Sequence, residues 1–284
     1  MRILYKLSVP IAPEAEEATV ALLEDMFQRT ACVETDLERN TTQVSVFLDK
    51  APARALLKPL LPRYSIRRLR HENWAESWKR HFRPIEIGSE LLIKPGWSKH
   101  KPKPNQALVV IDPGLSFGTG QHPTTRFCLE QIVACRRPGK TQSFLDVGTG
   151  SGILAIAAAK LGYSPVHALE IDPAAVRIAR ANAAKNRVRD KMRIVQKDFT
   201  HSKGSGKFDL ICANLLSDVL LAERSRLLER LKPGGILVVA GILMLQFDAI
   251  QRAYEAAGLR LVASGTENEW RSGAFAPRQN FLKK

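Results

Sequence analysis

A glycine-rich run follows a short apolar segment and precedes a helical one. It reads Asp146-Val147-Gly148-Thr149-Gly150-Ser151-Gly152 and comes directly after a strand expected at 144–147. Glycines, which lack a Cβ, let the backbone turn sharply and approach a ligand closely, and the N-terminus of the next helix attracts an anionic group. The run therefore predicts a nucleotide-type cofactor site, with Asp146, Gly148, Gly150 and Gly152 as candidate contacts.

A carboxylate stands where it can complete this site. Glu170 ends the second expected strand, twenty residues beyond Gly150, where an acid can accept hydrogen bonds from both ribose hydroxyls of an adenosine. Ile153 occupies the place of the third glycine in the dinucleotide pattern G-x-G-x-x-G, and no Gly-Lys-Ser/Thr of a Walker loop follows. The spacing therefore favours S-adenosylmethionine and methyl transfer.

Two polar residues lie at the ends of neighbouring strands. Asn214 ends the fourth expected strand, and its amide oxygen can accept a hydrogen bond from an incoming amine while the NH₂ group holds cofactor atoms. Asp198 follows the third expected strand and can accept from an adenine amino group. We expect in-line attack of an uncharged amine that Asn214 orients, and the sequence contains no evident general base.

A loop with three glycines and two prolines occupies residues 112–123 and leads into the pair Thr124-Thr125. The pair stands where a helix is expected to begin, so its hydroxyls can cap that helix or reach the cofactor. The loop supplies candidate substrate contacts, namely Phe117, Gly118, Thr119, Gly120 and His122. We expect His122 to position substrate, because the six histidines form no paired metal-ligand spacing, and we predict no metal.

An alternation of strands and helices from residue 143 onward must hold these groups in place. Strands are expected at 144–147, 166–169, 192–196, 208–213 and 236–240, and two more close the pattern near 260–264 and 270–275. Helices are expected between them at 153–161, 173–186, 218–231 and 245–257. This order predicts an α/β fold with a mostly parallel, doubly wound, Rossmann-like sheet, whose ligands bind beyond the carboxyl ends of the strands.

Residues 1–70 have a different pattern. Strands expected at 3–9, 31–36, 43–49 and 64–69, with helices at 14–29 and 52–61, give the order β-α-β-β-α-β of a ferredoxin-like α+β domain. It contains no histidine, and we interpret it as a substrate-recognition domain. Residues 71–105 are predicted to be a linker helix, with Trp74 and Trp78 on one face, and a connecting segment; residues 106–284 form the cofactor domain.

The composition fits a globular protein of a reducing compartment. The longest apolar run, 236–245, is half of the roughly 20 residues that a membrane helix needs. The first residues lack the pattern of a secretory signal, and the four cysteines form no C-x-x-C pair. We expect a cytoplasmic monomer without membrane contact.

The chain carries a formal net charge of +15, which is distributed unevenly. The segment Arg177–Lys207 contains ten basic residues against Asp190 and Asp198 alone. Such a surplus attracts nucleic acid or a nucleoprotein, so contact with ribosomal RNA is one interpretation of this basic face. A merely solvated surface is the other.

Several strings of residues resemble those of the bacterial ribosomal protein L-eleven methyltransferase family, PrmA. The resemblance covers residues 71–272, and its most specific string is Phe117-Gly118-Thr119-Gly120-x-His122-x-Thr124-Thr125. Other matching strings are Trp74-x-x-x-Trp78, Ile93-Lys94-Pro95-x-Trp97, the glycine run, Ala213-Asn214-Leu215-Leu216, Gly241-Ile242-Leu243 and Glu269-Trp270.

The resemblance implies a protein methyltransferase that methylates amines of ribosomal protein L-eleven, free or in the large subunit. The amines are lysine side chains, the N-terminal α-amine or both. Its cofactor, S-adenosylmethionine, would contact Thr125, Gly148, Glu170 and Asn214. Glu170 stands where the family usually has Asp, and the longer acid can still reach a diol.

Other functions remain open from the sequence. The enzyme could methylate a lysine of another protein or ribosomal RNA, although Asn214-Leu215-Leu216 lacks the Pro-Pro-aromatic sequence with which many base-amine methyltransferases stack a ring. A ribosome-binding protein with a degenerate cofactor site is the alternative without catalysis. The intact glycine loop argues against it, and an NAD-dependent dehydrogenase ranks last.

Overall fold

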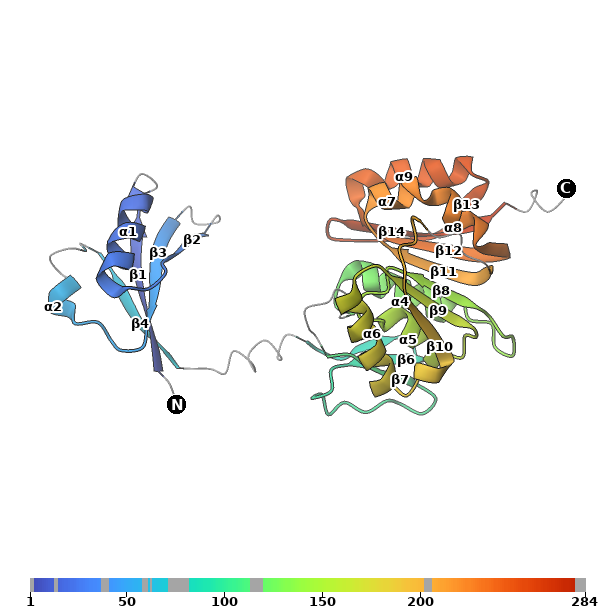
Figure 1. Cartoon of the computed structure of the whole chain (residues 1–284), viewed down its shortest axis with the longest axis horizontal. Helices are drawn as coiled ribbons and strands as arrows, with labels where there is room; N and C mark the ends of the chain where they lie inside the picture. Colours follow the sequence, from blue (N-terminus) through green and yellow to red (C-terminus); the bar gives the residue numbers. More distant parts are fainter. Residues whose placement is uncertain are drawn as a thin grey trace. The chain divides into compact units, whose positions relative to one another are not determined.

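In the computed structural model, the described residues form three β-sheets, one in the N-terminal part of the chain and two in the remainder (Figure 1). The structure describes residues 3–12, 15–36, 41–57, 61, 63–70, 82–112, 120–201 and 206–278. The chain divides into two units, Met1–His81 and Phe82–Lys284. Residues 71–81 lie outside the described ranges, so the linker helix with Trp74 and Trp78, and the domain boundaries drawn around it, stay predictions.

The first unit has a single antiparallel sheet with the order β2-β3-β1-β4. Its elements are β1 (Ile3–Ile11), α1 (Glu16–Phe27), β2 (Cys32–Asp36), β3 (Thr41–Leu48), α2 (Arg54–Leu57) and β4 (Ser65–Arg70). Leu23 of α1 is buried against Leu7, Val44 and Val46 of the sheet. The chain order and the strand order together are ferredoxin-like, which confirms the predicted topology.

The second unit is built on a seven-stranded sheet with the order β10-β9-β8-β11-β12-β14-β13. Its strands are β8 (Phe144–Val147), β9 (Val166–Glu170), β10 (Met192–Gln196), β11 (Phe208–Asn214), β12 (Leu231–Leu243), β13 (Leu259–Glu267) and β14 (Trp270–Pro277). The strands from β10 to β12 run parallel, whereas β14 is antiparallel to both of its neighbours. The predicted α/β fold with a mostly parallel sheet is confirmed.

Helices cover both faces of this sheet (Figure 1). They are α4 (Pro123–Ala134), α5 (Ile153–Lys160), α6 (Pro173–Lys185), α7 (Ser217–Ala222), α8 (Arg224–Glu229) and α9 (Met244–Ala256), with a short 3₁₀ turn η3 at Arg189–Lys191. Successive residues of β11 show the division: Leu210 and Cys212 pack with α4, α5 and α6, while Ile211 and Ala213 pack with α7, α8 and α9. This period of two is the signature of a strand buried on both faces.

One helix differs from its prediction. The helix expected at 218–231 is two short helices, α7 and α8, which meet at Glu223. Leu231 is not helical because it pairs with Phe208 as the first residue of β12. The apolar residues that mark this strand in the sequence begin at 236, so the sequence pattern could not reveal that β12 already begins at Leu231.

A small third sheet completes the second unit. It consists of β5 (Ile85–Ile87), β6 (Leu91–Lys94) and β7 (Ala107–Val110). Leu91, Ile93 and Val109 are buried in the cluster that also contains residues of α5 and β8. In the described ranges, no helix has both the length and the apolar character that crossing a membrane requires.

Candidate functional site

A cavity of about 380 Å³ lies where the parallel strands β8, β9 and β11 end. The strand order reverses between β8 and β11, and ligands of doubly wound sheets bind at such a point. The lining includes six residues predicted from the sequence, namely His122, Thr125, Gly148, Gly150, Glu170 and Asn214. The structure therefore brings together residues that are up to 92 positions apart, from His122 to Asn214.

At two positions of the glycine loop, the backbone lies so close to neighbouring side chains that a Cβ atom would crowd them. Gly148 has φ +74°, and a Cβ added there would lie 2.6 Å from Cδ2 of Leu215. Gly152, the N-cap of α5, has φ +84°, and a Cβ there would lie 3.2 Å from Cβ of Ala179 in α6. Gly148 thus shapes the cavity, while Gly152 lies outside its lining and permits the helices to pack.

Asp146 holds the glycine loop through hydrogen bonds. Its Oδ2 accepts hydrogen bonds from Oγ1 of Thr149 at 2.5 Å and from the backbone N–H of Ala155 at 3.3 Å. Burial raises the pKa of Asp146 to about 7, although the Thr149 hydrogen bond acts in the opposite direction. Asp146 is buried and does not line the cavity, so the structure gives it the role of fixing the loop.

Glu170 is held at the end of β9 by backbone N–H groups. Oε2 accepts from Gly150 at 2.9 Å, and Oε1 accepts from Ile171 at 2.9 Å and from Asp172 at 3.1 Å. A carboxylate offers about four lone-pair positions, so these three bonds leave about one, on Oε2. One position serves one ribose hydroxyl, so the predicted pairing of Glu170 with both hydroxyls of a diol requires that a backbone bond be shared.

Asn214, Thr124 and His122 form a chain of hydrogen bonds along the cavity. Nδ2 of Asn214 donates to Oγ1 of Thr124 at 3.2 Å, and this hydroxyl lies 2.7 Å from Nδ1 of His122. Burial lowers the pKa of His122, against the opposing charges of Glu269 and Glu267. A neutral imidazole can accept the Thr124 hydroxyl hydrogen at Nδ1, so every polar contact in the chain has a donor and an acceptor.

Thr125 has a different status from its neighbour. The residue is only 1 % exposed, and within the described ranges its Oγ1 has no hydrogen-bond partner. A buried hydroxyl without a partner costs roughly 1–3 kcal/mol. Because Thr125 lines the cavity, a ligand bound there can supply the missing partner.

Other predicted residues lie elsewhere. The carboxylate of Asp198 accepts from Thr200 and contacts His201, and these hydrogen bonds lower its pKa to about 2. It does not line the cavity, so its pairing with adenine stays a prediction. Gly120 packs near Ile153 and Ile85, while Phe117, Gly118 and Thr119 lie outside the described residues.

Trp270 was not predicted as a site residue, yet it lines the cavity and lies edge-on to His122, with ring centroids 5.0 Å apart. Because β14 runs antiparallel, its first residue lies beside Leu243 at the carboxyl end of β12. The sequence predicted a strand near 270–275 but not its direction. Only the direction reveals that residue 270 faces the site.

Seven further residues complete the lining, namely Thr124, Thr149, Ile153, Leu154, Leu215, Leu216 and Gly241. Leu216 is 71 % exposed and lies at the mouth of the cavity. The described residues contain no cluster of three His, Cys, Asp or Glu side chains that could hold a metal ion.

Comparison of the sequence with known proteins finds one family, the ribosomal protein L11 methyltransferases. The family model described as ribosomal protein L11 methyltransferase (PrmA) matches residues 13–276. The ribosomal protein L11 methyltransferase of Chloroflexus aurantiacus is 38 % identical over 237 residues, which cover 75 % of this chain and 71 % of that protein. That of Geobacter metallireducens is 39 % identical over 236 residues, covering 83 % and 76 %.

A solved structure agrees with these sequences. The ribosomal protein L11 methylase of Lactobacillus delbrueckii subsp. bulgaricus superposes with a TM-score of 0.63 at 33 % identity. The match covers 70 % of this chain and all of that one.

Proposed function

The chain belongs to the ribosomal protein L11 methyltransferase (PrmA) family. We propose that it methylates amines of ribosomal protein L11 with S-adenosylmethionine. The observation that carries the proposal is the hydrogen-bonded chain Asn214–Thr124–His122 beside a cavity at the strand ends. The amines are lysine side chains, the N-terminal α-amine or both.

The residues around the cavity fit the cofactor. The Thr125 hydroxyl, which has no partner among the described residues, the backbone of Gly148 and Gly150 in the cavity lining, and the remaining acceptor position of Glu170 offer complementary groups. Gly148 and Gly150 would leave room for the methionyl and ribose parts, and Glu170 would accept from a ribose hydroxyl. When bound, S-adenosylmethionine supplies a methyl group activated by its sulfonium sulfur.

Asn214 would position the amine. Since Nδ2 donates to Thr124, the amide is oriented with Oδ1 as the acceptor that remains for an incoming N–H. An amine that donates one hydrogen to this oxygen has its lone pair fixed in direction. Orientation of this kind accounts for a large part of the rate in transfer reactions.

The mouth of the cavity would favour a lysine. Leu215, Leu216 and Trp270 provide apolar surface for the four-carbon stem, and a desolvated pocket favours the neutral amine, whose reference pKa in water is about 10.4. Glu269, whose charge acts on His122, gives the approach a local negative potential, whereas Glu267 is paired with Arg126 at 3.9 Å. A lysine can therefore arrive as the cation and lose its proton to solvent before transfer.

The first unit would recognise the substrate protein. It has its own buried cluster around Leu7, Leu23 and Val46, separate from the clusters of the second unit. A variant that begins at Phe82 should therefore retain cofactor binding and lose methylation of ribosomal protein L11. If this variant modified the protein at the full rate, recognition by the first unit would be wrong.

We expect the reaction to take place in the cytoplasm. All four cysteines, Cys32, Cys128, Cys135 and Cys212, are free thiols in the structure, as suits a reducing compartment.

The deciding experiment combines the purified protein with S-adenosylmethionine and purified ribosomal protein L11. Intact and peptide mass spectrometry should detect added methyl groups on amines of that protein. A calorimetric titration with S-adenosylmethionine checks the cofactor site separately. Cofactor binding without any methylated amine on ribosomal protein L11 would contradict the proposed substrate.

A further inference from the structure

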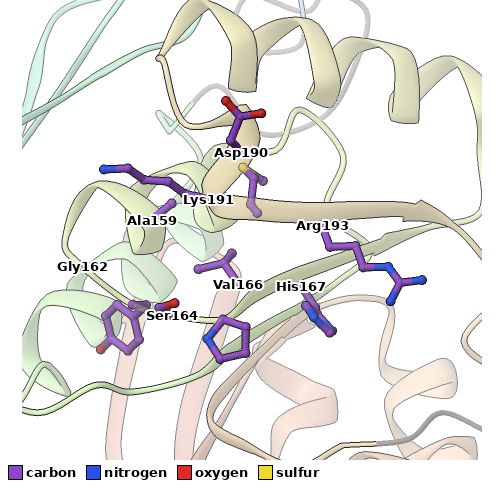
Figure 2. A pocket seen from close by; sticks show the side chains of 11 residues that line it. Ala159, Gly162, Ser164, Val166, His167, Asp190, Lys191 and Arg193 are labelled. Carbon is purple, nitrogen blue, oxygen red and sulfur yellow. The ribbon is translucent and has the colours of Figure 1, made fainter.

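A second and larger cavity lies at the amino-terminal ends of the parallel strands of the seven-stranded sheet. It has a volume of about 620 Å³ and is lined by the amino-terminal residues of β9 and β10, Val166 and Met192, and by the turn that follows α5 (Figure 2). The parallel strands begin here, whereas the cavity with Asn214 lies where they end. The function proposed above makes no use of this cavity.

Positive charge gathers around it. Lys191 and Arg193 line the cavity, and Figure 2 shows their side chains extending to opposite sides of the view, with Val166 and His167 between them. Lys160 ends α5 next to the lining residue Ala159, and the charges of Lys191 and Arg187 add to burial in lowering the pKa of Lys160. Several cations are therefore close enough to repel one another.

This charge is not neutralised within the described part of the protein. Among the described residues, no carboxylate forms an ion pair with Lys160, Arg187, Lys191 or Arg193. Asp190 is the single acidic side chain among the described residues of the lining. A concave surface that holds several repelling cations together with a single carboxylate is complementary to a ligand with several negative charges.

His167 adds an uncharged aromatic wall. Its ring lies edge-on to Phe208, with centroids 5.2 Å apart, and burial together with Arg193 and Arg230 lowers its pKa. The imidazole is therefore neutral near pH 7 and offers a ring and an N–H instead of a further charge. Cations combined with an aromatic ring suit a nucleic-acid strand whose bases are unpaired.

We propose that this basic groove, lined by His167, Lys191 and Arg193 with Lys160 and Arg187 beside it, binds the phosphate backbone of single-stranded RNA. The volume exceeds what one inorganic phosphate needs, and Figure 2 shows Lys191 and Arg193 extending to opposite sides, so the groove suits a strand with several phosphates better than a single anion. The groove is remote from Asn214, so RNA binding is independent of the proposed methyl transfer.

Fluorescence anisotropy of the full chain with a labelled oligouridylate of about 12 nucleotides tests the proposal, a length within the roughly 4–16 nucleotides that single-strand sites cover. The test variant is Lys191→Gln/Arg193→Gln. The matched control is Arg252→Gln/Arg260→Gln, which removes two exposed cations from α9 and β13 without touching the groove.

Loss of two phosphate contacts should reduce the slope of log K against log salt by about 1.4, because each contact to a single strand contributes about 0.7. At about 0.1 M salt the same loss weakens binding by roughly 25-fold. The control pair should change affinity less than about threefold. Unchanged methylation of ribosomal protein L11 and an unchanged unfolding temperature would show that the groove variant is folded.

Three results would overturn the proposal. The wild-type protein could fail to bind the oligouridylate, or both double variants could weaken binding equally, which would mean diffuse attraction by net charge. Polyglutamate could displace the labelled oligouridylate as effectively as unlabelled RNA does, which would mean that the site accepts an acidic peptide.

Discussion

Asn214, the last residue of β11, donates its side-chain N–H to the hydroxyl of Thr124 at 3.2 Å, across 90 positions of sequence. The bond ties the end of a central strand to the first turn of α4. It also determines which end of the carboxamide remains available, because the nitrogen is engaged and the oxygen has no hydrogen bond within the described residues.

Replacing Asn214 should separate catalysis from binding. Asn214→Ala removes the oxygen that orients the amine, and we expect kcat to fall by about 10²-fold, as for a reacting group displaced by about 1 Å. Affinity for S-adenosylmethionine should change only a few-fold. Thr124→Val keeps the amide but frees its nitrogen, so the loss of kcat should be smaller. Wild-type turnover in Asn214→Ala would contradict the positioning role.

Replacing Thr125 should affect the stability of the free protein and its affinity for the cofactor in opposite directions. Thr125→Val replaces a buried hydroxyl that has no partner among the described residues, so the free energy of unfolding without cofactor should stay equal or rise. Affinity for S-adenosylmethionine should fall by roughly 2- to 10-fold, since one hydrogen bond is lost.

The adjacent Thr124 provides the control for this test. Its hydroxyl is already hydrogen-bonded, so Thr124→Val should lower the free energy of unfolding by about 1 kcal/mol. Urea unfolding and calorimetry measure both quantities. A destabilised Thr125→Val with normal cofactor affinity would remove Thr125 from the cofactor site.

Asp146 should make stability depend on pH. Its pKa is raised from 3.8 to about 7 in the folded chain, which therefore holds the proton more tightly than the unfolded chain. The stability that the protonated form contributes is complete below about pH 4 and is lost as the pH rises through 7.

Asp146→Asn should therefore gain relative to wild type between pH 4 and pH 8. The gain amounts to a few kcal/mol, because one pKa unit corresponds to about 1.4 kcal/mol. Urea unfolding of both proteins across this range measures it. A difference between the two proteins that did not vary with pH would show that Asp146 titrates normally.

The steric role of Gly148 can be separated from its backbone conformation. Gly139 has a similar φ, +78°, but a Cβ there would meet no atom within 4 Å. Gly139→Ala should cost about 1 kcal/mol of stability, as a left-handed residue does. Gly148→Ala should cost about 1–3 kcal/mol more, because its Cβ also meets Leu215.

Combining Gly148→Ala with Leu215→Ala should recover the steric part of the cost. Thermal and urea unfolding measure the stabilities, and titration with S-adenosylmethionine measures the site. Equal costs at Gly139 and Gly148 would mean that the loop yields easily toward Leu215.

The sequence was informative where the chemistry depends on local order. The glycine loop, Glu170 and Asn214 each end a parallel strand or follow one directly, so the expectation that strand ends converge brought them to one cavity. The same rule suggested Asp198, but its carboxylate is engaged by Thr200 and His201. A position after a strand does not tell which partner a short polar turn will choose.

Other features depend on tertiary pairing and left no local signal. The direction of β14 decides that Trp270 faces His122, and the pairing of Leu231 with Phe208 decides that α8 ends early. The hydrogen bond between Asn214 and Thr124 similarly requires that α4 lie beside the end of β11. Periodicity within a segment contains none of this information.

The place of β14 between β12 and β13 also bears on the order of folding. β13 comes first along the chain, yet β12 pairs with β14, so this edge of the sheet cannot be added strand by strand. The wall that faces His122 forms only when a strand from beyond the β13 segment has closed a loop back to β12. Residues paired between β12 and β14 are 27 to 38 positions apart, whereas those paired between β8 and β11 are 66 positions apart. Pairing is slower for more distant residues, so the wall that faces His122 can form before β11 pairs with the strand that leads into the glycine loop.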